Sequence, residues 1–129
     1  MRDYADFENL VGMTLTSINV SRADDKIEFV TSNGVEFEMY HEQDCCEGVS
    51  IDDIVGDLDD LTGTPITLAE EVSDSGDTDY GTCTWTYYRL ATSKGLVSLK
   101  WYGESNGYYS ESVGFFRAQA RGALFVTTA

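Results

Sequence analysis

The sequence predicts a mostly β protein (α+β only in a minor sense), made of antiparallel sheets or meanders with one or two short helices. Three observations predict this class. β-Branched and aromatic residues alternate with polar ones over short stretches, as in half-buried strands. Turn-forming residues, including 12 glycines, separate these stretches. Apolar residues at helical spacing are few. A chain of 129 residues fits a single domain, residues 1–129, around one core.

The N-terminal third predicts a three-stranded antiparallel meander behind a short helix. Its strongest signal is the Asn33-Gly34 pair, because Asn-Gly accepts the positive φ angles of a tight hairpin turn at little cost. In the stretch VEFEMY that follows, apolar and acidic residues alternate, which predicts a half-buried strand with an acidic outer face. In chain order we expect a helix at Tyr4–Val11 with Phe7, Leu10 and Val11 on one side, strands at Met13–Val20, Lys26–Thr31 and Val35–Tyr40, and a polar turn at Arg22–Asp25.

The rest of the chain predicts an irregular middle and a second, aromatic meander. The stretch IVGDLDDL has apolar residues at near-helical spacing, and SDSGDTDYG is rich in turn formers and predicts a flexible acidic loop. In chain order we expect an extended segment at Val49–Asp53, helical turns at Ile54–Leu61, a strand at Pro65–Val72, the loop at Ser73–Gly81, strands at Thr82–Ala91, Leu96–Tyr102 and Tyr108–Phe116 (the last one alternatively leading into a short helix), and a tail from Arg117 to Ala129 that is an edge strand or a frayed end. Two three-stranded meanders would then flank the middle segment.

Charge is distributed unevenly along the chain. The net charge is −15; residues 1–79 carry 21 Asp and Glu against three Arg and Lys, a balance of −18, whereas residues 80–129 carry two against five, a balance of +3. Such acidity repels nucleic acid and membrane surfaces and attracts basic proteins, including those whose grooves normally hold phosphate. Solubility alone explains an acidic face equally well. The binding candidates in the acidic middle are Asp57, Asp59 and Asp60.

The segment YHEQDCCE is the first candidate site. A zinc ion would need His41, Cys45 and the distant Cys83 with a carboxylate, since adjacent cysteines point apart in an extended segment. A vicinal disulfide is disfavoured in a reducing cytosol, and a cysteine nucleophile with His41 as base is disfavoured by the acidic neighbours. A half-buried structural corner, whose polar side chains satisfy their own backbone, is the favoured interpretation, since cysteine is among the most buried residue types. The candidate binding residues are His41, Glu42, Asp44, Cys45, Cys46 and Glu47.

The segment WYGESNGYYSE is the second candidate site. Its mixture of Tyr, Trp, Ser, Gly and Asn is typical of recognition surfaces, although a hairpin whose aromatic residues enter the core explains it as well. Strand alternation places Trp101 inside and Tyr102 outside. If this segment faces the His41–Glu47 corner, the two form the best pocket for a ligand or a partner. The candidate binding residues are Trp101, Tyr102, Glu104, Asn106, Tyr108, Tyr109 and Glu111.

Motifs of catalysis and cofactor binding are absent from the sequence. It contains no phosphate loop, no G-x-S-x-G, no H-E-x-x-H, no dinucleotide fingerprint and no complete calcium loop. An enzyme is therefore disfavoured, and we assign no catalytic residue, no metal ligand and no cofactor. The N-terminus lacks an apolar leader and the cysteine count is three, so we expect a cytoplasmic protein.

Four stretches resemble a known family. YHEQDCCE and WYGESNGYYSE, with the acidic stretch from Ile51 to Ile66 and AEEVS at Ala69–Ser73, are similar to a family of small uncharacterised proteins of tailed bacteriophages and prophages. The resemblance covers most of residues 35–115. It implies a phage-type accessory role in the host-cell cytoplasm, and it carries over no catalytic residue.

The leading hypothesis is a non-enzymatic protein that binds and inhibits a host bacterial protein with a basic surface, in the manner of anti-defence and anti-CRISPR proteins. Nucleic-acid mimicry by the acidic surface is one means of doing so. We expect no direct binding to nucleic acid or membrane, and a homo-oligomer is a further option. The alternative is a small-ligand- or metal-binding module built from the His41–Glu47 corner and the Trp101–Glu111 turn.

Overall fold

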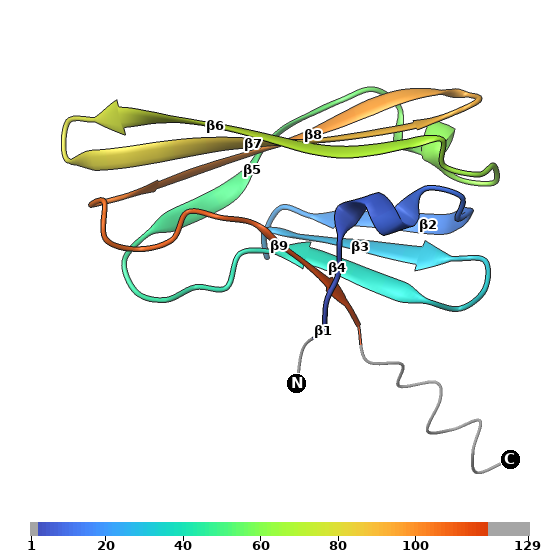
Figure 1. Cartoon of the computed structure of the whole chain (residues 1–129), viewed down its shortest axis with the longest axis horizontal. Coiled ribbons are helices and arrows are strands. Elements are labelled where there is room, and N and C mark those ends of the chain that lie inside the picture. Colours follow the sequence, from blue (N-terminus) through green and yellow to red (C-terminus); the bar gives the residue numbers. More distant parts are fainter. Residues whose placement is uncertain (1–2, 119–129) are drawn as a thin grey trace, which may run out of the picture.

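The computed structural model describes residues 3–118 and contains two antiparallel β-sheets packed face to face (Figure 1). The mostly β class is therefore confirmed. In the described part of the chain, helical structure is limited to two 3-10 turns, η1 (Phe7–Leu10) and η2 (Leu58–Leu61). No helix within residues 3–118 is long and apolar enough to cross a membrane. The tail expected beyond Arg117 lies, apart from Ala118, outside the described residues.

The first sheet has the strand order β1-β9-β4-β3-β2. Its larger part is the meander expected from the sequence, because β2 pairs with β3 and β3 pairs with β4, both antiparallel. Gly34 lies in the β3–β4 turn with a φ of 86°, a conformation that glycine adopts at little cost. The bounds are β1 (Asp3–Tyr4), β9 (Gly114–Arg117), β4 (Glu36–Tyr40), β3 (Lys26–Thr31) and β2 (Leu15–Ser21).

The second sheet has the strand order β5-β8-β7-β6. The flexible loop expected at Ser73–Gly81 is wrong, because β6 continues to Thr78 and pairs with β7 along its whole length. The hydrogen-bond partners that β7 offers override the local turn preference of Ser, Asp and Gly. The bounds are β5 (Gly48–Val55), β8 (Gly95–Ser105), β7 (Gly81–Thr92) and β6 (Leu68–Thr78).

Two other local expectations are wrong. Ile54 and Val55 end β5 instead of starting a helix, because their backbone pairs with β8. Residues 108–113, expected to begin a third strand of the second meander, form no strand. The chain instead returns to the first sheet, where β9 lies between β1 and β4. The partner of a strand is chosen by the tertiary fold, which the local pattern does not encode.

The core lies between the two sheets. Trp101 of β8 and Met39 of β4 connect them, since Trp101 Nε1 donates to Met39 Sδ at 3.3 Å. The turn η1 adds Phe7 and Leu10, whereas Val11, expected on the same side, is 49% exposed. Inward-facing positions of both sheets supply the other large buried side chains, among them Leu15, Ile27, Phe29, Phe115, Tyr88, Leu90 and Leu99.

The chain passes between the sheets twice, and both passages lie at the same end of the sandwich. The crossing segment, residues 41–47, leads from β4 to β5; the return segment, residues 106–113, leads from β8 to β9. The register pairs Tyr40 with Gly114 and Gly48 with Glu104, so the two segments begin and end beside each other. This arrangement positions the candidate site.

Candidate functional site

The crossing segment and the return segment contact each other through His41 and Ser112, a residue just beyond the Trp101–Glu111 turn of the pocket hypothesis. His41 Nδ1 lies 2.6 Å from the backbone oxygen of Ser112, and His41 Nε2 lies 2.6 Å from Glu47 Oε2. Both partners are oxygen acceptors, so the His41 ring bridges a backbone carbonyl and a carboxylate. The His41 and Glu47 side chains are only 4% and 0% exposed, so the contact between them is buried.

Glu47 is the centre of the crossing segment. Its Oε2 accepts the Asp44 N–H at 2.8 Å, and its Oε1 accepts the Cys45 N–H at 2.9 Å. The hydrogen bond from His41, followed by the one from the Asp44 backbone, lowers the pKa of Glu47 to about 2 against the opposing effect of burial. The carboxylate therefore stays ionised at neutral pH and organises the turn around it.

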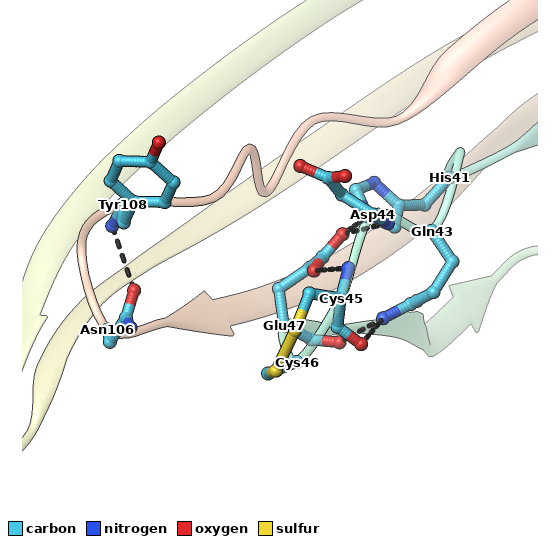
Figure 2. Close-up of a disulfide and its surroundings, with 8 residues drawn as sticks. All are labelled: His41, Gln43, Asp44, Cys45, Cys46, Glu47, Asn106 and Tyr108. Carbon is cyan, nitrogen blue, oxygen red and sulfur yellow. Dashed lines mark hydrogen bonds and ion pairs between the residues drawn. A yellow bond between two sulfur atoms is a disulfide. The ribbon is translucent and has the colours of Figure 1, made fainter.

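The remaining polar atoms of this corner are satisfied locally, as expected from the sequence. Gln43 Nε2 donates to the backbone oxygens of Glu47 at 2.6 Å and Cys45 at 3.2 Å. The vicinal disulfide that the sequence disfavoured is present, since Cys45 and Cys46 are bonded to each other, and both are exposed. The corner is half buried as expected, but the Glu47 side chain and not a cysteine occupies the buried position. Figure 2 shows the disulfide turned away from the His41 ring.

The structure does not bring together the residues that the metal and nucleophile hypotheses need. Cys45 is bonded to Cys46, and Cys83 is buried on β7. Within residues 3–118, no three His, Cys, Asp or Glu side chains lie together so that they could hold a metal ion. His41 pairs with Glu47 and not with a thiol. The set of His41, Cys45 and Cys83 is therefore not assembled.

Glu111 attaches the return segment to the second sheet. Its carboxylate accepts the hydroxyls of Thr82 at 2.6 Å and Thr84 at 2.8 Å, both on β7, and the hydroxyl of Ser105 at the end of β8. Partial burial raises the pKa of Glu111, but the three hydroxyl donors together bring it below its usual value. Gly103 permits this close approach, since a Cβ there would lie 3.1 Å from the Glu111 backbone oxygen.

The aromatic residues of the second candidate segment separate into buried and exposed members. Trp101 is completely buried, so its assignment to a recognition surface is corrected, whereas its inward orientation is confirmed. Tyr102 faces outward and packs against Trp85 in a tilted contact with ring centroids 5.7 Å apart. Its hydroxyl donates to Glu104 at 3.0 Å, and this bond is the largest cause that raises the pKa of Tyr102 to about 12.

Tyr108 and Asn106 are the exposed polar and aromatic groups beside the crossing segment (Figure 2). The Tyr108 side chain is 82% exposed and lies against Tyr109 with ring centroids 5.0 Å apart. The Tyr108 N–H donates to Asn106 Oδ1 at 3.0 Å, which shapes the turn. Glu42, on the crossing segment, accepts a hydrogen bond from the Tyr4 hydroxyl of β1 at 2.5 Å.

Residues 8–115 match the model of a family described as "Domain of unknown function (DUF7448)". The chain belongs to this family. The matched stretch runs from η1 to β9, so it includes both sheets, the crossing segment and the return segment. No curated protein and no solved structure matches the chain. Membership of the DUF7448 family implies a common ancestry but no activity, so function has to be argued from the site.

The acidic candidates of the middle lie away from this site. Asp57 caps η2, where its Oδ1 accepts the Asp59 N–H at 3.0 Å. A Cβ added at Gly95 would lie 2.6 Å from an Asp60 carboxylate oxygen, so η2 sits at the start of β8, whereas the crossing segment adjoins its end at Glu104. Nine residue steps along β8, from Gly95 to Glu104, separate these places by roughly 30 Å. The two sets of candidates do not form one site.

A groove of about 930 Å³ runs along the outer face of the first sheet, next to the crossing segment, and the sequence did not predict it. Register and burial place Glu28, Glu38 and Phe116 on this face, opposite the core. Alternation in VEFEMY indicated the acidic face, but the groove also needs the β2–β3 turn and β9. Its lining includes the carboxylates of Asp24, Asp25, Glu28, Glu36 and Glu38, the cations Lys26 and Arg117, the rings of Tyr40 and Phe116, and the residues Phe37, His41 and Gln43.

Proposed function

We propose that this protein is a non-catalytic binding protein whose groove on the first sheet takes a basic segment of a partner protein. The observation that carries the proposal is the charge of the groove's lining, which has five carboxylates but only one Lys and one Arg. A surplus of negative charge in a concave surface attracts and orients cationic partners and repels phosphate.

The carboxylates on β3 and β4 give the groove a net negative charge. Glu28 lies directly opposite Glu38 in the register of the two strands, an arrangement that destabilises a sheet when nothing compensates it. Lys26 compensates both, with Nζ 2.5 Å from Glu38 and 3.8 Å from Glu28. The bond to Glu38 is the largest cause that raises the pKa of Lys26. One cation between two carboxylates leaves negative charge that an Arg or Lys of a partner can neutralise.

The rings beside the carboxylates support a cationic side chain over a simple ion. Phe116 packs between Tyr4 and Tyr40 in tilted ring contacts, with ring centroids 4.8 Å and 4.7 Å away. Tyr40 and Phe116 both line the groove. Aromatic faces next to carboxylates favour the guanidinium of Arg or the ammonium of Lys, together with its apolar stem. The volume also falls in the range of protein ligand sites.

The finer form of the proposal places this binding in a host bacterial cell. The resemblance to phage and prophage proteins suggests that the partner is a host protein and that binding inhibits it. A basic groove that normally holds nucleic acid is then the natural target, because rows of carboxylates present negative charge as phosphates do. We do not propose the ligand-binding alternative, because His41, Glu47 and Glu111 already bind other groups of the chain.

Affinity capture from bacterial lysate with charge-matched variants tests the proposal. The groove variant is Glu28→Gln with Glu36→Gln; the control is Asp74→Asn with Asp77→Asn on the exposed edge strand β6. We expect a basic protein that is retained at low salt and released as salt rises. The groove variant should weaken its binding roughly tenfold and the control much less.

Three results would contradict the proposal. They are the capture of no partner, the capture of a partner whose affinity does not respond to salt, and an equal loss of affinity in the groove variant and the control. The last result would mean that general acidity, and not the groove, is responsible. A captured basic protein that binds nucleic acid, and loses it when this protein is added, would support the mimicry form.

A further inference from the structure

The exposed disulfide has a chemical property that the proposed function does not use. Of the three cysteines, Cys83 is buried and free, whereas Cys45 and Cys46 are exposed and bonded to each other. An exposed disulfide is open to attack by a thiolate, and the bond closes a small ring that includes the Cys45–Cys46 peptide. Its breakage therefore acts directly on the backbone of the crossing segment.

We propose that Cys45 and Cys46 form a thiol–disulfide exchange site whose oxidation state sets how firmly the crossing segment holds the return segment. A thiolate attacks one Sγ, the S–S bond breaks, and the other sulfur leaves and takes up a proton. A second thiol attacks the mixed disulfide and releases the remaining cysteine. The protein gains two electrons as two thiols, and the two attacking thiols become one disulfide.

The hydrogen bonds around Cys45 connect the disulfide to the return segment. The Cys45 N–H donates to Glu47 Oε1 at 2.9 Å, Glu47 Oε2 binds His41 at 2.6 Å, and His41 Nδ1 binds the Ser112 oxygen at 2.6 Å. Gln43 Nε2 donates to the Cys45 oxygen. Breaking the disulfide opens the ring and gives conformational freedom to Cys45, whose N–H and C=O make the first contacts of this chain. The oxidised state therefore favours the closed arrangement.

The surrounding charge selects the class of thiol. Asp44 and Glu47 flank the cysteines, Glu42 is nearby in the sequence, and the whole chain carries −15. Such a field slows an anionic reagent and disfavours cysteine thiolates. A neutral thiol or a dithiol is thus the expected reductant, and anionic glutathione reacts more slowly. The inference does not rest on the proposed function, because no partner takes part in it.

Thiol trapping on the folded, full-length chain tests the exchange. The oxidised protein is incubated with 2-mercaptoethanol or with glutathione at equal thiolate concentration, alkylated, and mapped by mass spectrometry. We expect alkylation at Cys45 and Cys46 but not at the buried Cys83, faster reaction with the neutral thiol, a smaller difference at high salt, and reversal by oxidised glutathione. Alkylation of Cys83 at the same rate as the pair, or no reaction of the pair before the chain unfolds, would overturn the proposal.

Hydrogen exchange tests the coupling. After reduction, we expect amides of the crossing and return segments to exchange roughly tenfold faster, while amides of β7 and β8 keep their rates. The Cys45→Ser, Cys46→Ser double variant should exchange quickly without any thiol, and Cys83→Ser should respond as the wild type does. If the double variant does not fold, the reduced wild type decides alone. Unchanged exchange in both segments after reduction would refute the coupling.

Discussion

Replacement of Glu111 by Ala is the sharpest test of how the return segment is held. The side chain is the single acceptor for the hydroxyls of Thr82, Thr84 and Ser105, which belong to two strands of the second sheet. Glu111→Ala removes all three bonds and the charge, but it leaves the core untouched. We expect the return segment to lose its attachment and the whole domain to lose stability.

The magnitude follows from the number and exposure of these bonds. A hydrogen bond to a charged acceptor contributes roughly 1.5–3 kcal/mol when it is well buried. Glu111 is only partly buried and its three donors share one carboxylate, so about 1 kcal/mol for each bond is the appropriate scale. The variant should therefore lose about 2–3 kcal/mol of unfolding free energy. For a domain of this size, Tm should fall by about 10 °C.

Urea denaturation with a double-mutant cycle measures this loss. Thr84→Val removes one donor, and in its background Glu111→Ala should cost about 1 kcal/mol less than in the wild type. Glu104→Ala is the control, because it removes the same charge from an exposed residue that binds only the Tyr102 hydroxyl on the same strand. The reasoning fails if Glu111→Ala shifts the midpoint no more than Glu104→Ala does, or if the cycle shows no coupling to Thr84.

Three further predictions concern the core, acid stability and the groove. Trp101→Ala should cost about 3–5 kcal/mol in urea denaturation, because a completely buried ring leaves a cavity; a loss under about 1 kcal/mol would contradict the core assignment. Folding lowers the pKa of Glu47 from 4.5 to about 2, so its stabilisation is complete above pH 4.5 and is lost as pH falls toward 2. Midpoints of Glu47→Gln should therefore change less across this range than those of the wild type, and parallel curves would refute the assignment. Lys26→Gln should cost roughly 0.5–1 kcal/mol at low salt, because Glu28 then faces Glu38 uncompensated; equal losses at low and high salt would argue against this charge effect.

Much of the fold was predictable because its signals are local. Lys26–Thr31 was expected as a strand and is β3 with the same bounds. Alternation with a period of two, together with an Asn-Gly turn, was sufficient for that hairpin. The failures are long-range. Residues 73–78 became strand because β7 runs beside them, and residues 114–117 joined the first sheet because β1 and β4 accept them. Neither partner is visible in the local pattern.

The sequence predicted which segments form the candidate site, but not the roles and contacts of their residues. Both unusual motifs overlap the two passages between the sheets, and the passages contact each other where His41 meets Ser112. The roles of their residues were different from those expected. Glu47 is buried and organises the turn, whereas the cysteines are exposed. Ser112 was not a candidate at all, because a backbone oxygen leaves no signal in the residue types of a sequence.

The sequence by itself determined most of the strand-forming stretches, the hairpin turn, the surplus of acidic charge and the two motifs worth examining. These follow from residue chemistry over a few neighbouring positions. Only the tertiary structure decided that His41 meets Glu47 and Ser112, that Thr82 meets Glu111, and that the carboxylates of three segments line one groove. Such contacts join residues far apart in the chain, and they exist only once strand order and register have brought both ends of the sheets together.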